Sequence, residues 1–268
     1  MTKVQKENFK VTFKNIYIYL VFLFLYLPIF IVIIFSFNTS KMNVVFQDFT
    51  FQWYGTFFKN RTLMEALSNT LIIAIISTLV STVIGTIGAV GLSKYNFKGK
   101  GIIDKLLYVP IVIPEIVLGI ALLSIYSLLN IPLGIISITL SHITFSIPFV
   151  VITVRARLAG SDKFLEEAAM DLGANRFVTF RKVTLPLIMP GVLSGAMLAF
   201  SLSIDDVVIS FFTCGPGSNT LPLKIFSMVK TGVTPEVNAL STVIMLITII
   251  IISINTSLQV KKLKAKPI

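Results

Sequence analysis

Six long apolar stretches limit what this chain can fold into. A transmembrane helix needs about 20 mainly apolar residues to cross the roughly 30 Å hydrocarbon layer of a bilayer. The 268 residues are 55% hydrophobic and only 13% charged, which is atypical of a soluble domain. We therefore predict an all-α, polytopic membrane protein with six transmembrane helices in a single transmembrane domain over residues 1–268. The predicted spans are residues 16–37, 69–93, 102–129, 131–157, 185–212 and 237–258.

The first apolar stretch is expected to remain in the protein as a span. It is longer than the core of a signal peptide, and it lacks a small-residue cleavage site. The other five spans, within residues 69–258, form the predicted core. The second span has a small residue at every fourth position, which gives one smooth helix face and predicts close packing in a bundle. These small residues are Ser77, Ser81, Gly85 and Ala89.

The distribution of positive charge predicts the orientation of the chain. Of the 23 Lys and Arg residues, 18 lie in four segments or at the span ends that border them: before the first span, between the second and third spans, between the fourth and fifth spans, and after the sixth span. In a six-span chain all four segments lie on one side, and cytoplasmic segments are the ones enriched in Lys and Arg. Both termini are therefore expected in the cytoplasm. The net charge of +11 reflects this orientation, so we expect contact with membrane lipid and none with nucleic acid.

Few residues in the sequence belong to a catalytic or cofactor-binding motif. Cys214 and His142 are the only cysteine and histidine, so the sequence holds neither a disulfide pair nor a Cys/His cluster at metal-ligand spacing. The phosphate-binding motif G-x-x-x-x-G-K-[ST] is missing as well. His142 beside Ser141 does not supply the nucleophile, base and orienting group of a hydrolase. We expect no cofactor, and we do not expect this chain to be an enzyme.

The connection between the fourth and fifth spans, residues 158–184, has the pattern of a surface helix. Apolar residues between Phe164 and Leu172 lie on one helix face. Gly173 is placed to end this helix in the left-handed conformation. Asn175 is placed to cap a second short helix that leads to the membrane surface.

This loop resembles the EAA loop of ABC-importer permeases. The matching residues are Glu167-Ala168-Ala169, then three residues, Gly173, nine residues, and Val183-Thr184-Leu185-Pro186, with Val183 where isoleucine is usual. The resemblance implies a type I ABC-importer permease with the MetI-like core. It also implies that the loop is a cytoplasmic coupling helix in a groove of a separate ATPase subunit. The implied coupling residues are Glu167, Ala168, Ala169, Gly173, Leu185 and Pro186. A helix that only lies on the lipid surface is the alternative.

Three carboxylates interrupt the apolar spans. Glu115 lies near the centre of the third span, and Asp205 and Asp206 lie in the outer half of the fifth. Such a group costs about 2.5 to 3.5 kcal/mol on insertion scales and usually faces a pathway, a partner or water. Apart from residues at the ends of the spans, no Lys or Arg lies within a neighbouring span, which leaves a protonated or hydrated carboxylate, a cation of a partner subunit, or a transported cation. We favour a transported alkyl-ammonium solute, because carboxylates and aromatic rings such as Trp53 both bind such cations.

The chain also resembles the second permease of spermidine/putrescine importers, most clearly over residues 202–212. The resemblance implies an inner-membrane subunit of a bacterium that forms half of a polyamine pathway. It implies three kinds of partner: two copies of an ATPase, a second homologous permease and an extracytoplasmic polyamine-binding protein. A permease for a different small solute, or a membrane channel or structural subunit, remains an alternative. The residues implied to serve polyamine passage are Trp53, Glu115, Ser203, Asp205 and Asp206.

Overall fold

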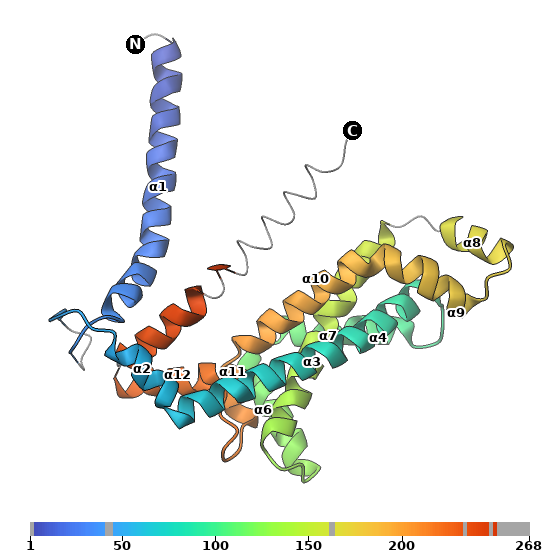
Figure 1. Cartoon of the computed structure of the whole chain (residues 1–268). Helices are drawn as coiled ribbons and strands as arrows, with labels where there is room; N and C mark the ends of the chain where they lie inside the picture. Colours follow the sequence, from blue (N-terminus) through green and yellow to red (C-terminus); the bar gives the residue numbers. More distant parts are fainter. Residues whose placement is uncertain (1–2, 41–44, 161–163, 233–234, 247–248, 251–268) are drawn as a thin grey trace. The chain divides into compact units, whose positions relative to one another are not determined.

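The computed structural model describes residues 3–40, 45–160, 164–232, 235–246 and 249–250 (Figure 1). In this part of the chain the regular secondary structure is helical, and one isolated bridge joins Asn38 and Phe49. By their internal contacts the residues fall into two compact units. Unit 1 contains Met1–Met64 and Ser227–Ile268, and unit 2 contains Glu65–Phe226. The helices are α1 (Lys3–Phe35), α2 (Gln52–Lys59), α3 (Arg61–Lys94), α4 (Lys100–Leu106), α5 (Val109–Val112), α6 (Glu115–Leu128), α7 (Ile135–Ala159), α8 (Phe164–Asp171), α9 (Arg176–Thr179), the π-helix η1 (Phe180–Thr184), α10 (Leu185–Ile204), α11 (Val208–Thr213) and α12 (Leu221–Thr231).

Four helices in the described part of the chain are long and apolar enough to cross a membrane. A bent pair of helices adds a fifth crossing if the pair is counted as one span. The sixth predicted span, residues 237–258, lies partly outside the described residues, which are helical over 235–246. The six-span count therefore stays a prediction. The four long helices are Lys14–Phe35, Arg61–Lys94, Ile135–Ala159 and Arg176–Ile204.

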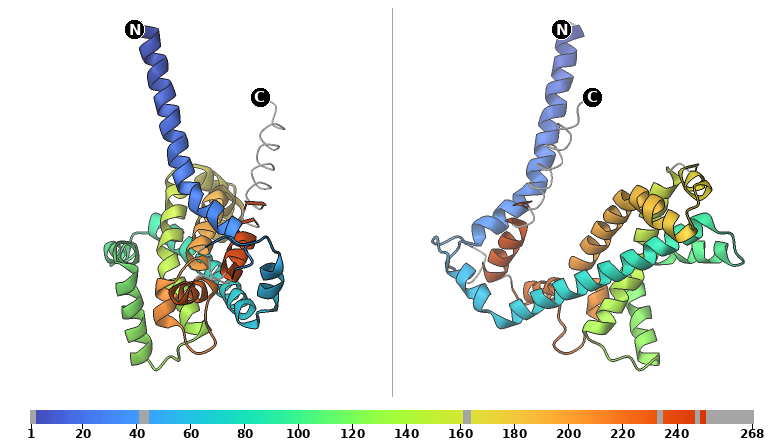
Figure 2. Two further views of the ribbon diagram at one scale, coloured as in Figure 1. Left: turned by 90° about the vertical axis from the view of Figure 1, so that its left-hand side faces the viewer. Right: turned by 45° about the vertical axis from the view of Figure 1, so that its right-hand side comes forward.

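The predicted third span is a bent pair of segments, Lys100–Val112 and Glu115–Leu128, which meet at an angle of 113°. The bend has a local cause. Pro114 disfavours a helical conformation in the residue before it, and Ile113 is extended with φ −71° and ψ 136°. Glu115 therefore lies at the corner, as the first residue of α6. Figure 2 shows α6 continuing through a short turn into α7.

The predicted fifth span, 185–212, starts where α10 starts, at Leu185, but its predicted end was wrong. The continuous helix runs from Arg176 through η1 and α10 and ends at Ile204. Asp205, Asp206 and Val207 then separate it from α11. Sequence periodicity missed this break because the apolar pattern continues on both sides of it.

Small residues let the helices of unit 2 pack closely. Packing between α7 and α10 is extensive, and the core around Val150 and Val154 of α7 includes Ala89 and Leu92 of α3. A Cβ atom added at Gly85 would lie 2.7 Å from the Val150 Cβ, so only glycine allows this approach. All four small residues predicted to face another helix are buried. The prediction of a close-packed bundle around the second span is confirmed within unit 2.

Unit 1 contains the aromatic-rich residues that follow α1. The Trp53 indole Nε1 donates a hydrogen bond of 2.6 Å to the Asn38 carbonyl oxygen. The hydroxyl groups of Tyr54 and Ser36 are hydrogen bonded at 2.7 Å. Asn60 donates to Glu236 Oε1 at 2.8 Å, which connects the residues around α2 with the helical stretch 235–246. Trp53 is thus half-buried, with its polar edge bound to the backbone.

Candidate functional site

The break between α10 and α11 brings polar side chains together inside unit 2. We call Asp205–Val207 the break segment. The Asp206 side chain caps the start of α11. Its Oδ1 accepts the amide N–H of Ile209 at 3.2 Å, and its Oδ2 accepts the amide N–H of Ser210 at 2.7 Å. The carboxylate therefore binds amide groups that an interrupted helix leaves without partners. This local capping explains why the chain begins a new helix here.

His142 of α7 lies beside this carboxylate. Its Nε2 is 3.3 Å from Asp206 Oδ2 and 3.2 Å from the Ser210 hydroxyl, and its Nδ1 is 2.7 Å from the Ser203 hydroxyl. The Ser203 hydroxyl is in turn 3.1 Å from that of Ser77 on α3. His142 is fully buried, and only 6% of the Asp206 side chain is exposed. We call these five residues, Ser77, His142, Ser203, Asp206 and Ser210, the histidine cluster.

The histidine cluster corrects the prediction that no group within the chain pairs with the span carboxylates. Lys and Arg were considered as partners, but histidine was not. The missed signal was a single histidine inside an apolar span, because ionisable groups in that setting usually have a specific partner. Asp206 consequently has a partner within its own chain.

The other predicted pathway residues lie in different surroundings. The side chains of Asp205 and Glu115 are exposed. In the described part of the chain, no hydrogen bond or ion pair joins Glu115 to either aspartate. The helix that begins with Glu115 nevertheless packs on α11, where the Phe212 ring contacts Gly119. Trp53 belongs to unit 1, so its relation to the carboxylates of unit 2 stays a prediction.

The residues of the EAA loop form a corner between two helices, as predicted. Gly173 follows α8 with φ +88°, the left-handed conformation that glycine adopts without strain. The Asn175 side chain accepts the amide N–H of Val178 at 2.9 Å and so caps α9. The chain then continues as helix through η1 into α10. Both sequence predictions for this corner, the glycine stop and the asparagine cap, are confirmed.

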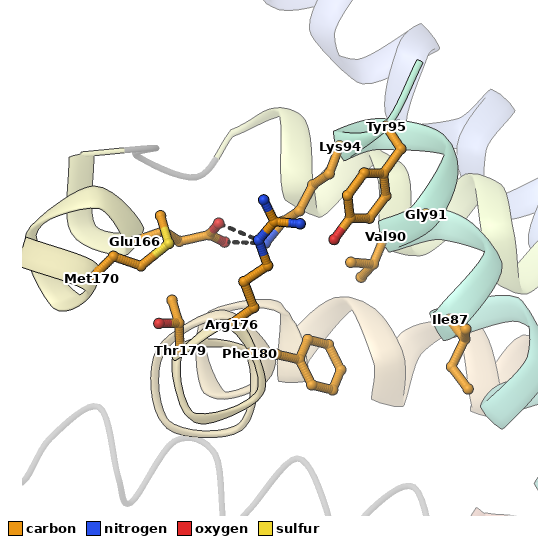
Figure 3. Close-up of a pocket in the computed structure, with 10 residues that line it drawn as sticks. All are labelled: Ile87, Val90, Gly91, Lys94, Tyr95, Glu166, Met170, Arg176, Thr179 and Phe180. Atoms are coloured by element: carbon orange, nitrogen blue, oxygen red, sulfur yellow. Dashed lines mark hydrogen bonds and ion pairs between the residues drawn. The ribbon is translucent and has the colours of Figure 1, made fainter. Parts of the chain in front are cut away.

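An ion pair connects α8 to the end of α3. Lys94 Nζ lies 2.7 Å and 2.5 Å from the two carboxylate oxygens of Glu166, and the Thr184 hydroxyl donates to Glu166 Oε1 at 2.7 Å. Burial alone raises the pKa of Glu166, but the hydrogen bonds from Lys94 and Thr184 and the charge of Lys94 outweigh it and lower the pKa. Figure 3 shows this pair at the edge of a cavity of about 390 Å³, into which Arg176 extends.

The corner formed by α8 and α9, residues 164–179, which we call the α8 corner, carries exposed apolar side chains. Phe164 is 74% exposed, Leu172 90% and Phe177 70%. Large exposed apolar surfaces usually mark a binding site for a partner or a membrane. The predicted coupling residues lie on and around this surface. Glu167, Ala168, Gly173 and Pro186 are exposed, while Ala169 and Leu185 are half-buried.

Comparison with known families identifies the class of protein. Residues 81–264 match the model of the family described as "Binding-protein-dependent transport system inner membrane component". This chain belongs to that family. It is therefore an inner-membrane transport component. The matched range contains the break segment and the α8 corner.

Curated relatives of this inner membrane component include two polyamine permeases of Escherichia coli K12. The spermidine/putrescine transport system permease protein PotC is 45% identical over 217 residues, which cover 81% of this chain and 82% of the relative. The putrescine transport system permease protein PotI is 39% identical, with 79% and 78% covered. A probable molybdenum ABC transporter permease protein of Haloferax volcanii is 30% identical, with 65% and 67% covered.

Solved structures support the fold. A chain of a bacterial ABC transporter that imports the acidic polysaccharide alginate superposes with a TM-score of 0.74 at 16% identity, covering 96% of this chain and 98% of the other. A chain of the MetNI methionine ABC transporter superposes with a TM-score of 0.59 at 18% identity, covering 75% and 94%. The inner membrane component therefore has the fold of ABC-transporter permeases.

Proposed function

We propose that this inner membrane component is the permease subunit of an ABC importer and forms half of a pathway for polyamines such as spermidine and putrescine. The observation that carries the proposal is an exposed carboxylate, Asp205, at a helix break in a chain 45% identical to a spermidine/putrescine permease. An alkyl-ammonium group binds a carboxylate by a charge-assisted hydrogen bond. Exposed Glu115, at the other helix corner, offers a second carboxylate.

The other proposed pathway residues act less directly. The Ser203 hydroxyl is already bonded to His142 and Ser77. Asp206 binds the amides of α11. The Trp53 indole N–H is bonded to the Asn38 carbonyl oxygen, so the proposed contact of Trp53 with the solute is a cation–π contact of its ring.

The proposed transporter includes two copies of an ATPase subunit, a second homologous permease and an extracytoplasmic polyamine-binding protein. The α8 corner is proposed to be the coupling helix, with both termini of the chain in the cytoplasm. An exposed apolar helix surface suits binding in a groove of the ATPase. Glu167 adds a charge that can pair with a basic residue of that partner.

Uptake by the complete complex in liposomes tests the substrate. With saturating binding protein and ATP, labelled putrescine and spermidine should accumulate, unlabelled polyamines should compete, and molybdate should not. Asp205→Asn should lower uptake about 10-fold, which corresponds to loss of one hydrogen bond to a charged group. Competition by molybdate, or full uptake by Asp205→Asn, would contradict the proposed substrate or the role of Asp205, respectively.

A photo-crosslinking amino acid at Leu172 tests the coupling assignment. Leu172 is 90% exposed, and Leu128, at the other end of unit 2, is 81% exposed and serves as the matched control. Illumination should join the ATPase to position 172 and not to position 128. Crosslinks only to lipid at position 172 would support the surface-helix alternative instead.

A further inference from the structure

His142 has a position that the proposed function leaves unexplained. It is fully buried on α7, yet both of its ring nitrogens have polar neighbours from other helices. Ser203 belongs to the last turn of α10, Asp206 belongs to the break segment, and Ser210 belongs to α11. The imidazole therefore connects the two sides of the break segment to α7.

We infer that His142 is the positioning residue of the break segment. It keeps Asp206 turned into the protein, so that Asp205 is the aspartate left to contact the solute. The inference rests on the proposed function, because it divides the two aspartates of the proposed polyamine pathway into different roles. Asp205 contacts solute, whereas Asp206 and His142 fix where Asp205 lies.

The contacts of the histidine cluster support this division. His142 Nε2 faces Asp206 Oδ2, and His142 Nδ1 is hydrogen bonded to the Ser203 hydroxyl, which in turn is hydrogen bonded to the Ser77 hydroxyl. Each of these side chains has a polar partner in the cluster, and they connect α3, α10, α7 and the break segment in that order. A buried network whose members are all satisfied stabilises one arrangement of the helices that contribute to it.

The surroundings of the two carboxylates also support different roles for Asp205 and Asp206. Both oxygens of Asp206 already bind amide N–H groups, and only 6% of its side chain is exposed. A solute ammonium group would have to displace these bonds. Asp205, one residue earlier, is exposed. A permease that must release its solute again needs an accessible carboxylate, and Asp205 provides one.

Two amide substitutions separate the contacts of His142. His142→Gln places an amide nitrogen near the position of Nε2 and keeps the contact with Asp206. His142→Asn places its amide near Nδ1 and keeps only the contact with Ser203. His142→Leu removes both contacts and keeps an apolar side chain. If the Asp206 contact positions the break segment, the Gln variant should work and the Asn variant should fail, although both are neutral and polar.

The first measurement is hydrogen exchange of peptides that cover α11 in the complete complex. The amides of Ile209 and Ser210 are protected by Asp206, so His142→Asn and His142→Leu should speed their exchange about 10-fold, as loss of a bond to a charged group predicts. His142→Gln and Asp205→Asn should leave the exchange as in the wild type. Unchanged exchange in His142→Leu would overturn the inference.

The second measurement is the ratio of spermidine to putrescine uptake with saturating binding protein. Asp205→Asn should change the ratio, because Asp205 is proposed to contact the solute directly and the two solutes differ in charge, so the lost contact differs in strength between them. His142→Asn should lower both rates by the same factor, and His142→Gln should restore both. A changed ratio in His142→Asn, or a Gln variant as impaired as the Leu variant, would overturn the positioning role.

Failure of the inference and failure of the proposed function give different results. If wild-type complexes transport neither polyamine, the substrate proposal fails, while the exchange experiment still reports on His142. If wild-type uptake is normal and α11 exchanges equally in all His142 variants, only the inference fails.

Discussion

The close approach of α3 and α7 at Gly85 leads to a quantitative prediction. A Cβ added at Gly85 would lie 2.7 Å from both Cβ and Cγ1 of Val150, and 3.3 Å from the Ile147 carbonyl oxygen. Carbon atoms normally approach to about 3.5 to 4.0 Å. The Val150 Cβ is fixed to its backbone, so the overlap cannot be relieved by a side-chain rotation. Gly85→Ala must therefore push the two helices apart.

Gly91 on the same helix provides the matched control, because a Cβ there would meet nothing within 4 Å. Both alanine substitutions gain the same helix propensity, so their difference isolates the overlap. Overpacking of this kind typically costs about 1 to 3 kcal/mol. With about 2 to 4 °C per kcal/mol for a chain of this size, Gly85→Ala should melt about 2 to 12 °C below Gly91→Ala.

Thermal unfolding of the detergent-solubilised complex, followed by fluorescence-detected size-exclusion chromatography, measures this difference. Adding Val150→Ala to Gly85→Ala should restore only part of it, since that change removes Cγ1 and leaves the Val150 Cβ in place. Equal melting of Gly85→Ala and Gly91→Ala would refute the inferred contact. Full recovery with Val150→Ala would show that the backbones are further apart than described.

Two further predictions concern the α8 corner. The Cβ of Gly173→Ala would meet no atom, but the alanine would have to adopt φ +88°. We expect this strain to raise the free energy of the corner by about 1 to 2 kcal/mol and to weaken ATPase binding about 5- to 30-fold in a pull-down titration. Gly173→Asn should be less affected, because asparagine tolerates the left-handed conformation better. Because the pKa of Glu166 is lowered in the folded chain, its stabilising effect is complete above the usual glutamate pKa of about 4.3 and is lost as the pH falls through the lowered value. The melting-temperature difference between wild type and Glu166→Gln should therefore be largest near neutral pH and disappear in acid; a constant difference would contradict the ion pair with Lys94.

Local sequence was sufficient to predict the helical class and the EAA corner. Apolar runs of membrane-spanning length follow from the cost of unsatisfied backbone groups in lipid, so they can be recognised without knowledge of packing. The left-handed Gly173 and the Asn175 cap are equally local, because each depends on the conformation of only a few neighbouring residues. The small residues from Ser77 to Ala89 also indicated a packing face from their spacing alone.

The break between α10 and α11 could not be predicted from the apolar pattern of the sequence. The apolar pattern continues through residues 185–212, and nothing in the spacing indicates that Asp206 turns back onto the amides of Ile209 and Ser210. The bend before Glu115 was easier to anticipate, since two prolines precede it. Its angle of 113° was not predictable, because proline removes a helical conformation without fixing the new direction of the chain.

The sequence by itself determined that this protein is a helical membrane component with a glycine-terminated corner at Gly173, because hydrophobic length and glycine conformation are local properties. Only the tertiary structure decided the partners of its charged groups. His142 and Ser203 are 61 positions apart, and Lys94 and Glu166 are 72 apart. Such pairs form where helices cross, and the crossing depends on packing across the whole of unit 2. For that reason two adjacent aspartates that look equivalent in the sequence have different surroundings: Asp206 is buried against His142, and Asp205 is exposed.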